Sequence, residues 1–285
     1  MDVVGLKHIV KPFVPIGVLD LFAQYQYARE RRNEDMRRAR FEGLRDVVPR
    51  TLAAIRALSA EQCRDRAYLE SVFIPSLGLN DELLHEMPTE FSAHYGKGLH
   101  IWQYPSQLAG YLSWIADNAL GITSYLEIGC RWGGMTILVT EWLRKNGAAI
   151  QSVSAIDPIR PTPFIEEYFK ILSTEGVASS YLQAFSTSSD AHAVVDRLRP
   201  DFVFIDGDHR LKGALEDHLL IRPHANVIVH HDIHSQACPD TTLLWKALQD
   251  MEADRFEATQ FIEQYPSVGG DFLGIGVLKR RSTAA

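Results

Sequence analysis

From about residue 120 onward, short apolar runs alternate regularly with amphipathic stretches. The apolar runs are typical of buried strands and cover Ser124–Gly129, Ser152–Asp157, Tyr181–Phe185, Asp201–Gly207 and Ala225–Asp232. The amphipathic stretches predict helices over Gly134–Asn146, Pro163–Glu175, Ser188–Leu198, Leu211–Leu220 and Thr241–Met251. Because this alternation requires crossover connections, the sequence predicts an α/β fold with a mainly parallel sheet and helices on both faces.

Outside this repeating part the pattern is less regular. Phe256–Ile262 and Gly274–Lys279 are expected to add an antiparallel pair at one edge, which makes seven strands in all. We expect a mainly helical region or lid over residues 1–115 and a core over residues 116–285. Arg29–Arg40 holds six arginines and three acids, which favours a solvated helix face over an anionic contact. Val3–Phe22 is expected to pack on the core, with a membrane surface or a partner protein as the alternative.

Composition excludes several classes of protein. The chain has 29 Lys and Arg against 36 Asp and Glu, a net charge of −7, which argues against a nucleic-acid-binding surface. Its three cysteines form no CxxC pair, so reduced thiols and a cytoplasmic location are expected. No segment has the roughly 20 mostly apolar residues of a membrane span, and no secretory signal is apparent.

The clearest local motif is YLEIGCRWGG, residues Tyr125–Gly134. A buried strand runs into Gly129, and two further glycines open the next helix, so backbone can approach a ligand closely there. The dinucleotide fingerprint GxGxxG is absent because Arg131 stands where it needs glycine. Glu127 suits an amine-bearing cation, and Asp157 at the end of the second strand suits ribose hydroxyls. The alternative is an ordinary strand–glycine–helix turn.

A second group of polar residues follows the fourth and fifth strands. Asp206, Asp208 and His209 follow one strand, and His230, His231 and Asp232 follow the other. Because adjacent parallel strands end at the same edge, Asp206 and Asp232 can share one cation site. Alternatively, Asp206 contacts a cofactor or caps a helix while the histidines satisfy buried backbone groups.

These two motifs carry a family resemblance over roughly Gly98–Lys279. E-x-G-x-x-x-G followed by an acidic second-strand end resembles the class I S-adenosylmethionine-dependent methyltransferases, whose fold is a Rossmann-like seven-stranded sheet. FIDGDH, residues Phe204–His209, is similar to the metal-dependent macrolide-sugar and novobiocin-type O-methyltransferases and the cephalosporin-biosynthesis methyltransferase. IWQYPSQ, residues Ile101–Gln107, resembles bacterial homologues encoded among polysaccharide genes.

The resemblance implies a cofactor and a set of contacts for it. S-adenosylmethionine would bind a loop of Glu127, Gly129, Arg131 and Gly133, with Arg131 reaching the cofactor carboxylate or solvent. Asp157 would hold the ribose. Ser186 would lie near the adenine, although this chain reads AFSTSSD where relatives read G-D-S. Replacing Gly129 by arginine is expected to abolish cofactor binding and to leave a folded protein.

The resemblance also implies a divalent metal, Mg²⁺ or Mn²⁺, on Asp206, His231 and Asp232. Relatives have two consecutive acids after the fifth strand, and here His231 replaces the first, which favours Mn²⁺, Fe²⁺ or Zn²⁺ over Mg²⁺. Asp206 and His209 would be catalytic, with His209 as the base that takes the proton of the acceptor hydroxyl. Four residues ahead of the core could stack on an acceptor or could instead be part of the hydrophobic core. They are Tyr95, His100, Trp102 and Tyr104.

The sequence therefore predicts a methyltransferase acting on a hydroxyl of a small molecule, a sugar or a glycosylated natural product or polysaccharide precursor. Two alternatives share its fold: a metal-independent methyltransferase and a non-catalytic cofactor-binding partner protein. A nicotinamide-dependent oxidoreductase is disfavoured by Arg131. A homo-oligomer stays open, as does the identity of the acceptor.

Overall fold

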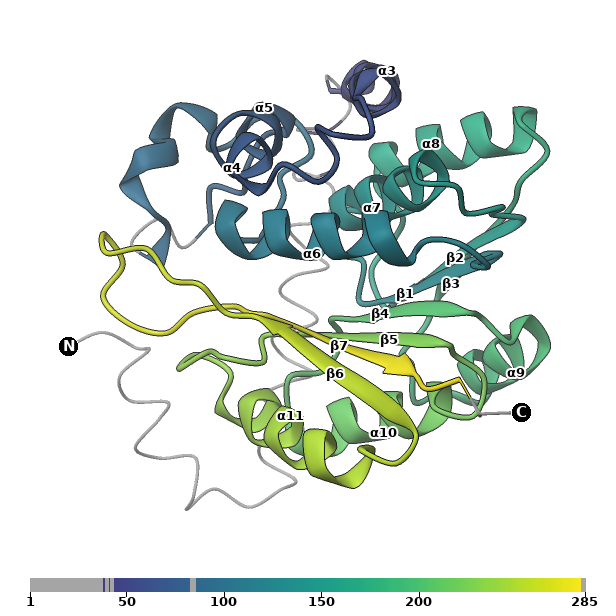
Figure 1. Cartoon of the computed structure of the whole chain (residues 1–285). Coiled ribbons are helices and arrows are strands. Elements are labelled where there is room, and N and C mark those ends of the chain that lie inside the picture. The colour runs from purple at the N-terminus through teal and green to yellow at the C-terminus, as the bar shows by residue number, and fades with distance from the viewer. Residues whose placement is uncertain (1–37, 39–40, 42–43, 83–85, 283–285) are drawn as a thin grey trace.

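The computed structural model of this chain describes residues 38, 41, 44–82 and 86–282. Its centre is a seven-stranded sheet in the order β3-β2-β1-β4-β5-β7-β6 (Figure 1). The strands are β1 Ser124–Ile128, β2 Ser152–Asp157, β3 Ala178–Gln183, β4 Phe202–Ile205, β5 Val227–His231, β6 Phe256–Phe261 and β7 Ile275–Arg280. β1 to β5 are parallel, and β7 runs antiparallel to both β5 and β6. The predicted fold class and the antiparallel edge pair are confirmed.

The order of the strands reverses direction beside β1. The chain proceeds outward from β1 through β2 to β3, then returns to place β4 on the other side of β1. In open α/β sheets, ligands bind at such a switch point, outside the carboxyl ends of the strands. The residues that follow β1, β2 and β4 therefore surround the expected ligand position.

Helices cover the sheet in two layers. α6 Pro105–Asn118, α7 Gly134–Lys145 and α8 Pro163–Thr174 lie on one face, and α9 Ser189–Leu198, α10 Leu211–Ile221 and α11 Pro239–Met251 lie on the other (Figure 1). Side chains alternate along each strand, so Tyr125 and Phe204 join the core under the first layer, while Leu126 and Ile205 join the second core. The five predicted helices of the core are all present.

The third strand differs from its prediction. It was expected at Tyr181–Phe185, but β3 spans Ala178–Gln183. β3 is an edge strand whose residues are exposed or half-buried throughout, so its first half needs no apolar side chains. The polar sequence Ala178–Ser180 therefore gave no strand signal, although it pairs with Ser152–Ser154 of β2.

The described part of the N-terminal region consists of short helices packed on the first layer. They are α3 Val47–Ala57, α4 Arg66–Tyr68, the π-helical turn η2 Leu69–Phe73, α5 Ile74–Leu77 and the 3₁₀ segment η4 Thr89–His94. The largest hydrophobic cluster extends from Phe41 to Val277. The segment Val3–Phe22, and Arg29–Arg40 apart from Arg38, lie outside the described residues. None of the described helices is long and apolar enough to cross a bilayer.

The connection between β6 and β7 folds back onto α6. The Gln107 side-chain amide donates to the carbonyls of Glu263 and Phe272, and its oxygen accepts from the Gly274 N–H. Gln107 is fully buried, so these bonds satisfy a polar group that would otherwise destabilise the fold. They fix the β6–β7 connection beside the carboxyl end of β5, since Ile275 pairs with His231.

Candidate functional site

The loop between β1 and α7 is shaped by contacts with the rest of the chain. Gly129 has φ +83°, and a Cβ built there would lie 2.1 Å from the Asp206 carbonyl oxygen. A Cβ on Gly133, with φ +84°, would lie 2.3 Å from the Ile165 side chain. These glycines therefore allow the loop to pack against the β4–α10 loop and α8. The expectation that Gly129→Arg leaves the fold intact is wrong, because any side chain there meets backbone.

Two predicted acids lie at the ends of β1 and β2. Glu127 is 1% exposed and accepts hydrogen bonds from Tyr125 Oη at 2.8 Å and Thr136 Oγ1 at 2.7 Å. Burial raises the pKa of Glu127 to about 8. Asp157 accepts from the backbone N–H groups of Arg131 and Ile159, and burial nevertheless raises its pKa to about 6. Both carboxyls lie where a cationic or hydroxyl-bearing ligand would stabilise their charged forms.

Arg131 contacts the N-terminal region. Its backbone has φ +44°, and its guanidinium donates to Glu82 Oε2 at 2.7 Å. The same guanidinium lies over the Trp102 ring, 4.6 Å from the ring centroid. The prediction that Arg131 reaches the cofactor carboxylate or solvent did not include Glu82, because an exposed acid in a turn carries no local signal of the residue that it contacts.

Ser186 follows β3 as predicted, and its side chain lies near Asp217 of α10, where it favours the charged form of that carboxyl. Asp217 is 1% exposed, and burial raises its pKa to about 7. The sequence analysis did not select Asp217. Helical spacing could have revealed it, because Ala214, Asp217 and Ile221 share the buried stripe of α10.

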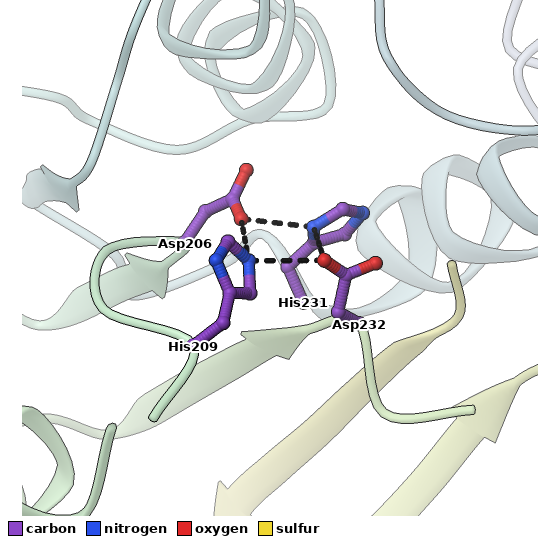
Figure 2. Close-up of side chains that lie close together, drawn as sticks. All are labelled: Asp206, His209, His231 and Asp232. Atoms are coloured by element: carbon purple, nitrogen blue, oxygen red, sulfur yellow. Dashed lines mark hydrogen bonds and ion pairs between the residues drawn. The ribbon is translucent and has the colours of Figure 1, made fainter. Parts of the chain in front are cut away.

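The second constellation converges at the ends of β4 and β5 (Figure 2). His231 Nδ1 lies 2.9 Å from Asp206 Oδ1, and His209 Nε2 lies 3.2 Å from the same oxygen. His209 Nε2 is also 2.9 Å from Asp232 Oδ2, which in turn is 3.7 Å from His231 Nδ1. The structure thus brings together all four of these residues, which the sequence singled out from two different loops.

The charges of the four residues support one another. Burial disfavours the charged form of each, but the two nearby histidines outweigh it and hold the pKa of Asp206 well below its usual range. Burial likewise opposes protonation of His209, yet its hydrogen bonds with Asp206 and Asp232 raise its pKa well above the usual range. The side chain of His209 is 39% exposed, whereas that of His231 is 4% exposed. His209 is therefore the most exposed member of the cluster, followed by Asp206, whose side chain is 26% exposed.

Cys238 also contacts this cluster, which the sequence did not indicate. Its Sγ lies 3.2 Å from Asp232 Oδ2, just before α11 begins. Thr241 Oγ1 donates to the Asp232 carbonyl at 2.7 Å and thereby fixes the backbone after β5. Asp232 itself has φ +56°, a conformation that non-glycine residues rarely adopt.

The cluster has the donor set of a metal site. One ligand atom from each of Asp206, His209, His231 and Asp232 lies within 4.8 Å of the others. Among the described residues, His231 Nε2 and Asp232 Oδ1 are buried without a hydrogen-bond partner. Two carboxylates with two imidazoles fit Mn²⁺, Fe²⁺ or Zn²⁺ better than Mg²⁺, which prefers oxygen ligands alone.

The β1–α7 loop and this cluster are in direct contact, since a Cβ on Gly129 would lie 2.1 Å from the Asp206 carbonyl oxygen. The Asp206 N–H donates to the Ile128 carbonyl at 2.8 Å, because β1 and β4 are neighbours in the sheet. A ligand held by the β1–α7 loop would therefore lie next to Asp206 and His209.

The four aromatic or imidazole candidates of the N-terminal region separate into two pairs. Tyr104 is fully buried and donates to the Glu86 carbonyl, and His100 is 4% exposed, so both are core residues. Tyr95 and Trp102 are half-buried and pack beside the cluster of Met87, Phe272 and Leu273. Trp102 is the one of the four that lies against the cofactor loop, through Arg131.

His230 belongs to a different environment from its neighbour His231. Adjacent residues of a strand point to opposite faces, and His230 Nε2 lies 3.1 Å from Nδ1 of the fully buried His218 on α10. Burial lowers the pKa of His218, and it lowers that of His230 well below the usual range. Both imidazoles are therefore neutral in the folded chain at neutral pH.

This pair predicts a loss of stability in acid. A histidine whose pKa is depressed by folding stabilises the fold fully above its unfolded pKa of about 6.5, and that stability is lost as pH falls below it. Replacing His218 by glutamine removes one titrating group but keeps a donor and an acceptor. We expect the free energies of unfolding of the two proteins, from urea titrations between pH 7.5 and 5.5, to converge as pH falls, by up to about 1.4 kcal/mol per pH unit below 6.5.

The difference between the two proteins is taken at each pH because the pKa shift of Glu127 has the opposite effect on how stability changes with pH. Its raised pKa of about 8 means that its contribution is present at low pH and is lost as pH rises. A difference between wild type and His218→Gln that stays constant with pH would contradict the assignment of a neutral buried pair.

Residues 126–233 match the model of a known protein family, which is described as a methyltransferase domain. The match begins within β1, ends two residues after β5, and includes both the glycine loop and the four-residue cluster. No curated protein matches the sequence of this chain.

Solved structures with similar folds include several methyltransferases. Cofactor-bound Rv0187 from MTB is 24% identical, with 60% of this chain and 79% of that chain covered and a TM-score of 0.40. MycE from the mycinamycin biosynthetic pathway, in complex with Mg, SAH and mycinamycin VI, is 15% identical, with 61% and 49% covered and a TM-score of 0.41. A putative RNA methyltransferase from Pyrococcus horikoshii is 11% identical, with 75% and 96% covered and a TM-score of 0.42.

Proposed function

We propose that this chain is an S-adenosylmethionine-dependent O-methyltransferase that acts on a hydroxyl of a small molecule with the help of a divalent metal. The observation that carries the proposal is the contact between the β1–α7 loop and the acid–histidine cluster, where Gly129 approaches Asp206 so closely that a Cβ on Gly129 would lie 2.1 Å from the Asp206 carbonyl oxygen. In this arrangement a methyl donor held by one loop would lie beside an acceptor activated by the other. Holding two reactants in the right geometry supplies a large part of the rate enhancement that an enzyme gives to a reaction between them.

The residues of the β1–α7 loop and of β2 match the parts of the cofactor. In this proposal Glu127 faces its ammonium group, Asp157 accepts from the ribose hydroxyls, and Gly129 and Gly133 let the backbone approach. Ser186 lies after β3 near the adenine. The two acids and the guanidinium of Arg131 complement a ligand that carries an amine, a carboxylate and hydroxyls.

His209 acts as the general base in this proposal. This role requires a neutral imidazole, which a divalent ion would favour by offsetting the carboxylate charge of Asp206 and Asp232 that raises the pKa of His209. It is the exposed imidazole of the cluster, and its Nε2 is held between Asp206 and Asp232. A hydroxyl is a weak nucleophile until its proton is removed, and a positioned imidazole contributes roughly 10²–10⁴-fold to such a step. Asp206, His231 and Asp232 would hold the metal. When bound, a divalent ion supplies charge that offsets the two carboxylates and favours loss of the acceptor proton.

The net charge of −7 supports a small-molecule acceptor over a nucleic acid. A sugar or a glycosylated natural product or polysaccharide precursor is the acceptor class that the resemblance favours. The N-terminal region over residues 1–115 would shape the acceptor site as a lid on the core over residues 116–285. On the basis of the sequence, the proposal also includes a cytoplasmic location and leaves a homo-oligomer open.

The proposal is tested by calorimetric titration of the whole chain with S-adenosylhomocysteine, in the presence and in the absence of Mn²⁺. We expect one site per chain, and we expect Asp157→Ala to weaken binding at least about tenfold through loss of charge-assisted hydrogen bonds. Asp250→Ala, an acid at the end of α11, serves as the control and should bind as wild type. Absence of heat with wild type at several temperatures would overturn the cofactor assignment.

Turnover then separates the alternatives. Methyl transfer to an acceptor found by screening sugars and glycosylated metabolites should stop with a chelator and return with Mn²⁺. Chelator-insensitive turnover would establish the metal-independent methyltransferase. Binding of S-adenosylhomocysteine together with no turnover on any acceptor would favour a cofactor-binding partner protein.

A further inference from the structure

The guanidinium of Arg131 lies between the cofactor loop and the N-terminal region. Arg131 leaves the β1–α7 loop one residue before Trp132, and its backbone N–H donates to Asp157 Oδ2 at 2.8 Å. Its side chain crosses to Glu82, which it reaches at 2.7 Å, and lies over Trp102. The loop that approaches the cofactor thus carries a cation that is already paired with a carboxylate of its own chain.

The Glu82 carboxylate accepts only part of the hydrogen bonds that the Arg131 guanidinium can donate. Within the described part of the chain, the hydrogen bonds of the Arg131 side chain go to Glu82 through one nitrogen. A guanidinium has five N–H donors in a fork that matches a carboxylate with two bonds. The side chains of Arg131 and Glu82 are 40% and 34% exposed, so the ion pair is accessible, and exposed pairs contribute little to stability.

Glu82 is held in place by the fold. Its N–H donates to Asn80 Oδ1 at 2.6 Å, and the N–H of the buried Asn80 donates to the Ile101 carbonyl at 2.9 Å. Ile101 directly precedes Trp102, so Glu82 and Trp102 approach Arg131 from one anchored unit. The carboxylate is therefore presented to the guanidinium by a fixed turn of the backbone.

We propose that Glu82 occupies the position at Arg131 that the α-carboxylate of the cofactor takes, so that the two carboxylates compete for one guanidinium. This inference rests on the proposed function and concerns its regulation. S-Adenosylmethionine carries an ammonium and a ribose, for which Glu127 and Asp157 are placed, and a carboxylate, for which Arg131 is the cation of the loop. Cofactor binding then separates Glu82 from the Arg131 guanidinium. It thereby loosens the contact between the β1–α7 loop and the segment around Trp102.

The test compares two ligands that differ in one group. S-Adenosylhomocysteine has the α-carboxylate, and its decarboxylated analogue S-adenosyl-3-thiopropylamine lacks it. By calorimetry on the full chain, Glu82→Gln should tighten S-adenosylhomocysteine about three- to fivefold, the effect expected of an exposed ion pair, and leave the analogue within twofold. Arg131→Met should weaken S-adenosylhomocysteine at least about tenfold, with a smaller effect on the analogue.

Two further variants complete the design. In Arg131→Met the substitution Glu82→Gln should have no further effect, since the guanidinium for which the carboxylates compete is gone. Glu90→Gln removes the same charge from the same region but contacts Ser267, and it should bind both ligands as wild type. Melting temperatures close to wild type would show that the variants are folded.

The outcomes are distinct. Unchanged or weaker binding of S-adenosylhomocysteine by Glu82→Gln overturns the competition, and so does equal tightening of both ligands. A wild type that binds neither ligand overturns the proposed function together with this inference. If wild type binds S-adenosylhomocysteine and Glu82→Gln binds it with the same affinity, this inference alone is overturned.

Discussion

Asp206→Asn is expected to lower methyl transfer by about 100-fold or more and to weaken Mn²⁺ binding in parallel. The carboxylate of Asp206 lies within hydrogen-bond distance of both histidines of the cluster, at 2.9 Å from His231 and 3.2 Å from His209, whereas Asp232 lies 2.9 Å from His209 but 3.7 Å from His231. Asparagine keeps the shape of the side chain but loses the charge and one of the two acceptor oxygens. The measurements are calorimetry with Mn²⁺ and initial rates with the acceptor that screening provides.

Two comparisons make this result specific. Asp208→Asn changes an acid two residues away whose carboxylate pairs with Arg210 outside the cluster, and it should retain Mn²⁺ affinity. His209→Gln should lose turnover while Mn²⁺ and S-adenosylhomocysteine still bind, because we assign His209 to the base. Full Mn²⁺ affinity in Asp206→Asn would remove this residue from the metal site.

Gly129→Ala is expected to destabilise the fold by about 2–5 kcal/mol. Alanine with a left-handed backbone costs roughly 1–2 kcal/mol, and forcing an extra atom into packed structure costs roughly a further 1–3 kcal/mol. Here the added Cβ would lie 2.1 Å from the Asp206 carbonyl oxygen, and backbone cannot move aside as a side chain can. The free energy of unfolding from urea titration measures the effect.

The chain supplies a matched control for this substitution. Gly121 has the same φ of +83°, but a Cβ there meets nothing within 4 Å. Gly121→Ala should therefore cost only the backbone part, about 1–2 kcal/mol. If the two variants are equally stable, the close approach of Gly129 to the β4–α10 loop is not a constraint on the fold.

The sequence allowed much of the sheet to be predicted because buried parallel strands are continuous apolar runs, as in Phe202–Ile205 and Val227–Val229. It placed β3 three residues late because an edge strand can be polar. The cluster of Asp206, His209, His231 and Asp232 was predictable, since the ends of adjacent parallel strands necessarily meet.

Contacts that join distant segments through side chains were not predictable. Nothing in the local pattern around Glu82 indicates that it reaches Arg131, 49 residues away, because exposed acids are common in any turn. Cys238 lies beside Asp232 through the path of the loop after β5, which no periodicity encodes. Asp217 was missed for a different reason, since its place on a buried helical stripe is visible once the helix is drawn.

The three bonds of Gln107 have a consequence for how the protein is made. Within the described residues, its buried amide bonds to backbone at Glu263, Phe272 and Gly274, as many as 167 residues later in the chain. On the ribosome, α6 is synthesised long before those partners exist, and during that time the amide must remain in contact with water. The face of α6 that carries Gln107 can therefore close only when synthesis is almost finished. A nascent chain halted before residue 274 should leave this face accessible to chaperones, although β1 to β5 are already present.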